Sequence, residues 1–174
     1  MHPMPEQLII IPHAEAQPRS TWSAHDDDRP LAALGRRQAA ALAEAIGPVD
    51  AVRSSPSLRC VQTVEPLAAL SARPVETLDA WRQATREPGP WDRHLDERMR
   101  LAVHGASTAG RVGAALGHGN GRVAVCSHGD TIPIIIAHVA ALLGVDVPAL
   151  AARGGWYEVG GGAVTAHGAL VGEH

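Results

Sequence analysis

Residues 8–11, Leu-Ile-Ile-Ile, limit the possible folds of this chain more than any other stretch. A short apolar run that ends at a breaker is typical of a fully buried strand in a parallel sheet. Pro12 cannot donate a hydrogen bond to a neighbouring strand, so the strand should end there. His13 then lies beyond the carboxyl end of the strand, where open α/β sheets bind ligands. Taken alone, a histidine at this position is more often structural than catalytic.

The rest of the chain repeats a strand followed by a helix. Apolar spacing predicts helices over residues 30–46, 56–70, 93–116 and 132–143, and strands over residues 49–52, 75–78 and 122–127. Ser55 before Pro56 is a favourable cap for the second helix. Residues 156–159 and 163–166, joined by three glycines, predict a hairpin. The sequence therefore predicts an α/β fold, a three-layer α-β-α sandwich whose mostly parallel sheet has an antiparallel edge.

Length and charge restrict the classes of protein. With 174 residues, 45 % of them apolar, we expect one domain over residues 1–174. A formal net charge of −3 gives no general attraction to nucleic acid or anionic membranes. We see no secretory segment and no stretch long enough to cross a bilayer, and we expect a cytoplasmic location. Cys60 and Cys126 are expected to be free buried thiols, as in a reducing cytosol.

Several other features are expected to carry no chemistry. The acidic run at residues 26–28 is expected to be a solvated loop, and residues 82–92 a surface excursion. The glycine-rich residues 117–121 precede a strand, whereas a phosphate-cradling loop opens a helix. None of the ten histidines has metal-ligand spacing, so we expect no metal and no other cofactor. Trp22 and Trp81 are expected to pack in the protein, with the mouth of a pocket as the alternative.

Two histidines and an arginine stand out because each follows a strand. His13 and His128 come directly after buried strands, and Arg59 lies near the start of a helix that follows another. If these strands are parallel neighbours, the three side chains meet at one edge of the sheet, beside a helix N-terminus that favours anions. A neutral imidazole can attack phosphorus while charged donors hold the phosphoryl oxygens. The three residues therefore indicate a phosphoryl-group site.

An ordered set of short motifs supports this interpretation. The set consists of His13-Ala14-Glu15-Ala16, Asp26 before Arg29-Pro30-Leu31, Gly35, Gln38, Ser54-Ser55-Pro56, Arg59-Cys60, Gln62-Thr63, Pro66-Leu67-Ala68, Ser127-His128-Gly129-Asp130 and Ile132-Pro133. With these residues nearly the whole chain resembles the histidine phosphatase superfamily, also called phosphoglycerate mutase-like. It looks most similar to the compact phosphohistidine phosphatases and to the histidine-phosphatase domains fused to Nudix hydrolases.

The resemblance implies a role for each matching position. His13 would be the nucleophile that becomes phosphohistidine, Arg59 would bind phosphate, and His128 would donate to the phosphoryl oxygens. Arg19 and Gly129 are further candidates for phosphate binding. The substrate would be a phosphorylated small molecule or a phosphoprotein.

One position departs from the family pattern. The family normally has an arginine just before the nucleophilic histidine, where this chain has Pro12. Losing a hydrogen bond to a charged group costs roughly 1.5–3 kcal/mol, and losing a transition-state donor about 10²–10³ in rate. The arginines that could replace it are Arg19, Arg53, Arg82 and Arg153.

A general acid is not evident either. Many relatives use a glutamate after the third strand to protonate the leaving group. The candidates here are Glu76, Asp79 and Glu87, while Gln83 aligns near that position. The compact phosphohistidine phosphatases work without this acid, because an imidazole leaving group needs less help. This favours their class of substrate.

Two functions remain open at this stage. The first is a phosphatase with a covalent phosphohistidine at His13. The second is a phosphate- or anion-binding regulatory module of the same fold, impaired by Pro12. A phosphoglycerate mutase is disfavoured, because the segment at residues 79–92 is short for an insertion that closes over substrate. The sequence leaves the oligomeric state and the physiological substrate open.

Overall fold

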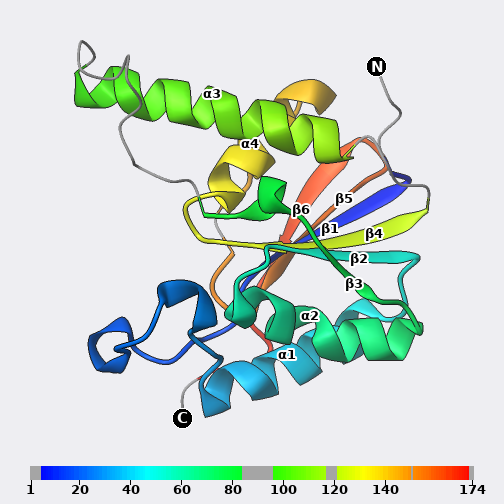
Figure 1. The fold of residues 1–174 in the computed structure, drawn as a ribbon. Helices are drawn as coiled ribbons and strands as arrows, with labels where there is room; N and C mark the ends of the chain where they lie inside the picture. The colour runs from blue at the N-terminus through cyan, green and yellow to red at the C-terminus, as the bar shows by residue number, and fades with distance from the viewer. Residues whose placement is uncertain (1–4, 84–95, 117–120, 150, 173–174) are drawn as a thin grey trace.

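In the computed structural model, which describes residues 5–83, 96–116, 121–149 and 151–172, one sheet of six strands forms the middle layer (Figure 1). The strands are β1 (Gln7–Pro12), β2 (Ala51–Ser54), β3 (Val75–Thr77), β4 (Arg122–Ser127), β5 (Trp156–Gly160) and β6 (Ala163–His167). Their order is β3-β2-β4-β1-β5-β6, with β1 to β4 parallel, β5 antiparallel to β1, and β6 antiparallel to β5. The predicted mostly parallel sheet with an antiparallel edge is confirmed.

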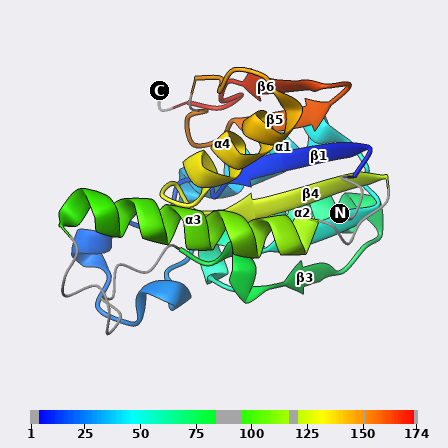
Figure 2. The same cartoon turned by 90° about the horizontal axis from the view of Figure 1, so that it is seen from above.

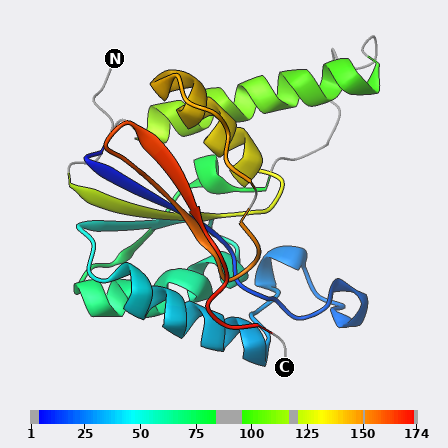
Figure 3. The same ribbon diagram turned by 180° about the vertical axis from the view of Figure 1, so that it is seen from behind.

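Helices cover both faces of the sheet. The helices α1 (Ala33–Ile46) and α2 (Leu58–Ser71) lie on one face, and α3 (Glu97–Leu116) and α4 (Ile132–Leu143) lie on the other (Figures 1 and 3). Short 3-10 helices are η1 (Arg19–Thr21), η2 (Asp26–Asp28) and η3 (Asp79–Trp81). In the part of the chain that the structure describes, no helix is both long and apolar enough to cross a membrane.

The apolar run in β1 is explained by its place in the sheet. Figure 2 shows β1 beside β4 in the middle, with β3 towards one border and β6 towards the other. Ile9 and Ile11 belong to the core with α1 and α2, whereas Leu8 and Ile10 belong to the core under α4. A strand covered on both faces needs apolar side chains at every position, which is why the run does not alternate.

Two predicted helix starts are wrong by two or three residues. The first helix begins at Ala33 and not at residue 30, because Leu31 forms a bridge with Ala16 and donates its N–H to Gln62. The second begins at Leu58 with Ser57 at the cap position. Ser55 is therefore not the cap, since its hydroxyl binds His128. The third helix begins at Glu97, and predicted residues 93–95 lie outside the described part.

One further prediction needs correction, and two others are confirmed. The acidic run is not a solvated loop, because it forms η2 and its carboxylates bind arginines and Ser57. Trp81 is fully buried in the core under α4, so it packs in the protein as predicted. Cys60 and Cys126 are free buried thiols, as predicted. Most of the predicted surface excursion and of the turn at residues 117–121 lies outside the described residues.

Candidate active site

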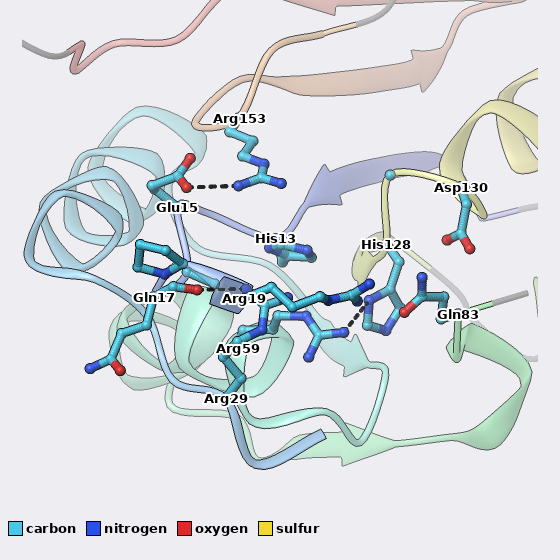
Figure 4. Close-up of a pocket in the computed structure, with 13 residues that line it drawn as sticks. His13, Glu15, Gln17, Arg19, Arg29, Arg59, Gln83, His128, Asp130 and Arg153 are labelled. Atoms are coloured by element: carbon cyan, nitrogen blue, oxygen red, sulfur yellow. Dashed lines mark hydrogen bonds and ion pairs between the residues drawn. The ribbon is translucent and has the colours of Figure 1, made fainter. Parts of the chain in front are cut away.

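The sheet brings His13, Arg59 and His128 together. In the parallel register Pro12 lies opposite Ser127, so the two histidines leave neighbouring strands at the same level. Their ring centroids are 5.6 Å apart, with the planes at 71°. Arg59 comes from the first turn of α2, directly after the next strand, β2. All three line one pocket of about 360 Å³ (Figure 4), as the order of strands and helices predicted.

His13 is held as a neutral base whose Nε2 has no hydrogen-bond partner among the described residues. Its main-chain N–H donates to the carbonyl of Ser127 over 3.0 Å, and the next N–H, of Ala14, donates to Oγ1 of Thr63 over 3.0 Å. Its Nδ1 lies 2.9 Å from the carbonyl oxygen of Ala14, which can only accept, so Nδ1 carries the proton. Burial, followed by the positive charges around it, lowers the pKa of His13 to about 3. Its Nε2 therefore keeps an electron pair at neutral pH.

His128 is bound through both ring nitrogens. Nη2 of Arg59 donates to Nδ1 over 3.2 Å, because a guanidinium cannot accept. Nε2 consequently holds the proton and donates to Oγ of Ser55 over 2.8 Å. The His128 side chain is 2 % exposed, so these contacts fix its ring in the wall of the pocket. In this arrangement neither ring nitrogen of His128 is free to bind a ligand.

Arg59 is tied to Asp26 but keeps one unused donor. Nη1 donates to the carbonyl of Asp26 over 2.6 Å, and Nη2 lies 3.0 Å from its carboxylate. Arg19 and Arg29 bind the same carboxylate. Partial burial would raise the pKa of Asp26, but the charge of Arg59 and the hydrogen bonds from Arg29 and Arg19 outweigh it and lower that pKa. Nε of Arg59 is buried and has no hydrogen-bond partner among the described residues.

The pocket has more positive than negative side chains. Besides the three predicted residues, its lining includes Arg19, Arg29, Arg153, Glu15 and Asp130. The side chain of Arg153 binds Glu15 with Nη1 and Oε1 2.8 Å apart. Four arginines stand against two carboxylates in this lining, which suits a small multiply charged anion.

The structure separates the four arginines proposed as replacements at Pro12. Arg19 and Arg153 line the pocket with His13. Arg53 instead pairs with Glu76, and Arg82 pairs with Asp27 and Asp79. Arg53 and Arg82 do not line this pocket.

The candidate acids separate in the same way. Glu76 and Asp79 line a different pocket together with Arg53, so neither faces His13. Gln83 lines the pocket of His13, as its alignment with the acid position predicted. Glu87 lies outside the described residues. Among the described residues no group of three or more histidine, cysteine or acidic side chains could hold a metal ion.

Gly129 lines the pocket beside His128, yet a Cβ at this position would meet nothing within 4 Å. Four charged lining residues had no role predicted from the sequence: Glu15, Arg29, Asp130 and, beyond its place in a list of alternatives, Arg153. Glu15 and Asp130 each lie two residues beyond a site histidine, which is a signal that could have found them. Nothing local marks Arg153, because its partner is 138 residues away.

Comparisons with known proteins bear on the fold that carries this site. The model of the histidine phosphatase superfamily (branch 1) matches residues 8–100. A structure of TTHB049 from Thermus thermophilus is similar, with a TM-score of 0.63 and 23 % identity, over 94 % of this chain and 99 % of that one. The protein histidine phosphatase SixA complexed with tungstate has a TM-score of 0.55 and 22 % identity, over 92 % and 94 %. No protein with a curated description matches. The two structures share the fold.

Proposed function

Because the chain belongs to branch 1 of the histidine phosphatase superfamily, we propose that it hydrolyses a phosphohistidine or a small phosphate monoester through a covalent phosphohistidine at His13. One observation carries this proposal. His13, whose Nε2 makes no hydrogen bond to a described residue, lines the same pocket as Arg59, whose guanidinium is one of the charged donors of that lining. Nε2 of His13 can attack phosphorus, and the guanidinium can donate to a phosphoryl oxygen.

The reaction has two steps that balance at this site. Nε2 of His13 attacks phosphorus and a P–N bond forms, while the bond to the leaving group breaks and its electron pair leaves with that group, which takes up a proton. Water then attacks the phosphorus and loses a proton to solvent. The electron pair of the P–N bond returns to Nε2 as inorganic phosphate leaves. The hydrogen bond from Nδ1 to Ala14 persists throughout and stabilises the positive ring of the intermediate.

Arg59 and His128 change partners when phosphate binds. A phosphoryl oxygen is a stronger acceptor for Nη2 of Arg59 than the neutral Nδ1 of His128 that it now contacts. Once Nδ1 is released it can bind a proton and donate to another phosphoryl oxygen. Arg59 and His128 thus stabilise the charge that develops on the oxygens in the transition state.

The lining favours phosphohistidine as the substrate class. Of the acids predicted from the sequence, Glu76 and Asp79 line a different pocket, and the amide of Gln83 has no acidic proton to give; the carboxylates of the lining are Glu15, which is paired with Arg153, and Asp130. A phosphate ester with a poor alcohol leaving group needs such an acid, whereas an imidazole leaving group needs less help. The similar fold of the protein histidine phosphatase SixA supports the same class, with a phosphorylated protein as the partner.

A phosphate-binding regulatory module is the second candidate. Two observations favour it: Pro12 offers no donor, and both ring nitrogens of His128 are already bound by Arg59 and Ser55. If these contacts persist with ligand present, the pocket binds phosphate without transferring it.

Hydrolysis of an aryl phosphate separates the two candidates, because its good leaving group needs no acid. We expect the wild type to be active and His13→Ala to lose activity by about 10⁴-fold or more, since the nucleophile is gone. Arg59→Ala and His128→Ala should each lower kcat/KM by about 10²–10³. His138→Ala is the matched control, because it removes an imidazole that does not line the pocket, and it should change nothing.

Phosphoenzyme formation gives an independent readout. After brief incubation with phosphoramidate, intact mass should show one added phosphoryl group on the wild type and none on His13→Ala. Turnover that survives in a folded His13→Ala protein would overturn the mechanism. A silent wild type that becomes active in Pro12→Arg would favour the regulatory module.

A further inference from the structure

We propose that Arg153 is a phosphoryl-binding residue of this site, reaching it from the segment before β5. This inference rests on the proposed function and assigns a further residue to it. Arg153 lies 140 positions beyond His13 in the sequence and in none of the motifs around the two histidines.

The position of Arg153 beside His13 is the first argument. Arg153 lines the main pocket, and with Pro12, His13 and Tyr157 it also lines a smaller adjoining one of about 110 Å³. It therefore lies on the side of His13 where Pro12 leaves the wall without a donor. Its positive charge is one of those that lower the pKa of His13, which places the guanidinium within electrostatic reach of the imidazole.

The second argument is that the Arg153 main chain is anchored. Gln38, which is buried in α1, accepts the N–H of Glu15 over 2.9 Å and donates to the carbonyl of Arg153 at 3.5 Å. Ala151 donates its N–H to the hydroxyl of Tyr157, a fully buried side chain of β5. Gly154 has a φ of 82° and fits against Gln38, where a Cβ would lie 3.0 Å from the amide. The segment is thus bound on both sides of Arg153.

The third argument is the direction of the Arg153 side chain. Its Nη1 binds Oε1 of Glu15 over 2.8 Å, and Figure 4 shows the guanidinium held between Glu15 and His13. A guanidinium has five N–H donors in a rigid fork, so a single contact with a carboxylate leaves others for a ligand. An exposed ion pair contributes little to the free energy of folding, so the main effect of this pair is to orient the guanidinium of Arg153.

The fourth argument is the arrangement of the other arginines. Arg19, Arg29 and Arg59 all bind Asp26, whereas Arg153 is the arginine of the described lining that binds elsewhere. Figure 4 shows Arg153 on one side of His13, and Arg59 and Arg29 on the other. A phosphoryl group on Nε2 of His13 would meet guanidinium groups from both sides. Its three equatorial oxygens need donors in several directions.

The experiment compares four proteins: wild type, Arg153→Ala, Arg153→Lys and the control Arg73→Ala. Arg73 is an exposed arginine just beyond the far end of α2 from Arg59, so its removal gives the same change in net charge. Binding of inorganic phosphate is measured by calorimetry, and kcat and KM are measured with an aryl phosphate. We expect Arg153→Ala to weaken phosphate binding by about tenfold to a hundredfold, as for one charged hydrogen bond. Lysine should restore part of this loss, and the control should match the wild type.

A rescue variant tests the position more sharply. Pro12→Arg in the Arg153→Ala protein puts a guanidinium on the same side of His13, and it should recover most of the lost phosphate binding. Equal phosphate binding in Arg153→Ala and in Arg73→Ala would overturn the inference, and so would a wild type that binds no phosphate.

The two proposals fail in different ways. A wild type that binds phosphate but turns over no substrate, with binding lost in Arg153→Ala, contradicts the proposed function and supports this inference. A wild type that is active, with unchanged binding and turnover in Arg153→Ala, contradicts this inference and supports the function.

Discussion

His13 owes its chemistry to burial more than to any partner. Desolvation is the largest influence on its pKa and lowers it, and the positive charges of Arg59 and Arg153 act in the same direction, against the hydrogen bond to Ala14. An imidazole with the ordinary pKa of 6.5 would be protonated in part near neutral pH, and its electron pair would then not be available for attack. The same surroundings that bind an anion therefore keep the attacking nitrogen unprotonated.

The low pKa of His13 predicts a loss of stability in mild acid. The folded-state pKa is about 3 and the unfolded value is 6.5, so between these values the unfolded chain binds more protons. The contribution of His13 is therefore complete above pH 6.5 and declines as the pH falls towards 3. From pH 7 to pH 4.5 the free energy of unfolding should fall by about 2–3 kcal/mol from this residue.

Urea unfolding at both pH values checks this, with His13→Gln as the variant that cannot titrate. The difference in free energy of unfolding between wild type and variant should shift by the stated amount. Parallel losses in the two proteins would show that His13 does not titrate abnormally. An NMR titration gives the same answer directly, because the ring signals of His13 should stay constant from pH 8 to pH 5.

The pattern of the residues alone predicted three site side chains, each of which follows a strand. His13, Arg59 and His128 follow buried strands, and the parallel sheet brings such residues together whatever the details of packing. Arg153 and Asp26 owe their places to ion pairs with distant partners, and a sequence carries no local sign of these. For the same reason the charge pattern predicts a solvated loop over the acidic run at η2, whereas its Asp26 binds three arginines of the site.

At the scale of elements, the contact between α1 and the segment after β1 sets the shape of the site. Ala32 donates its N–H to the carbonyl of Glu15 over 2.9 Å, and Gly35 lies in the first turn of α1 against the same carbonyl. A Cβ on Gly35 would overlap that oxygen, in a backbone contact that no side-chain rotation relieves. Absence of a side chain here lets the helix approach the loop of His13.

Replacing Gly35 with alanine should therefore be destabilising, although alanine usually favours a helix. We expect a loss of about 1–3 kcal/mol in the free energy of unfolding, as for overpacking, and a fall in kcat/KM as Glu15 moves. Gly110→Ala on the exposed face of α3 is the matched control, since its Cβ would meet nothing within 4 Å. That variant should gain about 0.5–1 kcal/mol. If chemical denaturation shows that both variants change the free energy of unfolding in the same direction, the clash at Gly35 is contradicted.

The elements themselves were largely predictable. The strand Arg122–Ser127 and the helix Ile132–Leu143 have the predicted bounds, because each is an uninterrupted apolar pattern between clear breakers. The start of α1 was predicted too early because Leu31 is apolar and fits the helical spacing, yet it serves a bridge to Ala16. Such long-range pairing overrides the local helix propensity, and the spacing of the apolar residues does not show it.

At the scale of the whole molecule, β1 depends on a strand from the other end of the chain. Leu8, Ile9 and Ile10 pair with β5, and Tyr157 and Val159 of β5 are buried in the core under α4. Each fully buried large apolar side chain contributes roughly 1.5–3 kcal/mol. The hairpin is therefore part of the central structure, although it forms the antiparallel border.

A chain that ends at residue 149 should consequently lose cooperative unfolding. It lacks β5 and β6, so β1 becomes an open edge and its core partners are missing. Thermal unfolding followed by circular dichroism and calorimetry measures this. A chain that ends at residue 168 keeps both strands and should retain one sharp transition. A sharp transition in the shorter chain would contradict the central role of the hairpin.

The strand order also has a consequence for synthesis. On the ribosome the chain emerges from its amino end, so β1 and His13 appear first, while the neighbours that cover β1 on either side, β4 and β5, appear late. During this interval the most apolar strand is exposed, and exposed strands of this kind aggregate. Arg153 emerges after β4 and shortly before β5. The nascent chain is therefore exposed to aggregation until residues 156–160 are free to close the sheet.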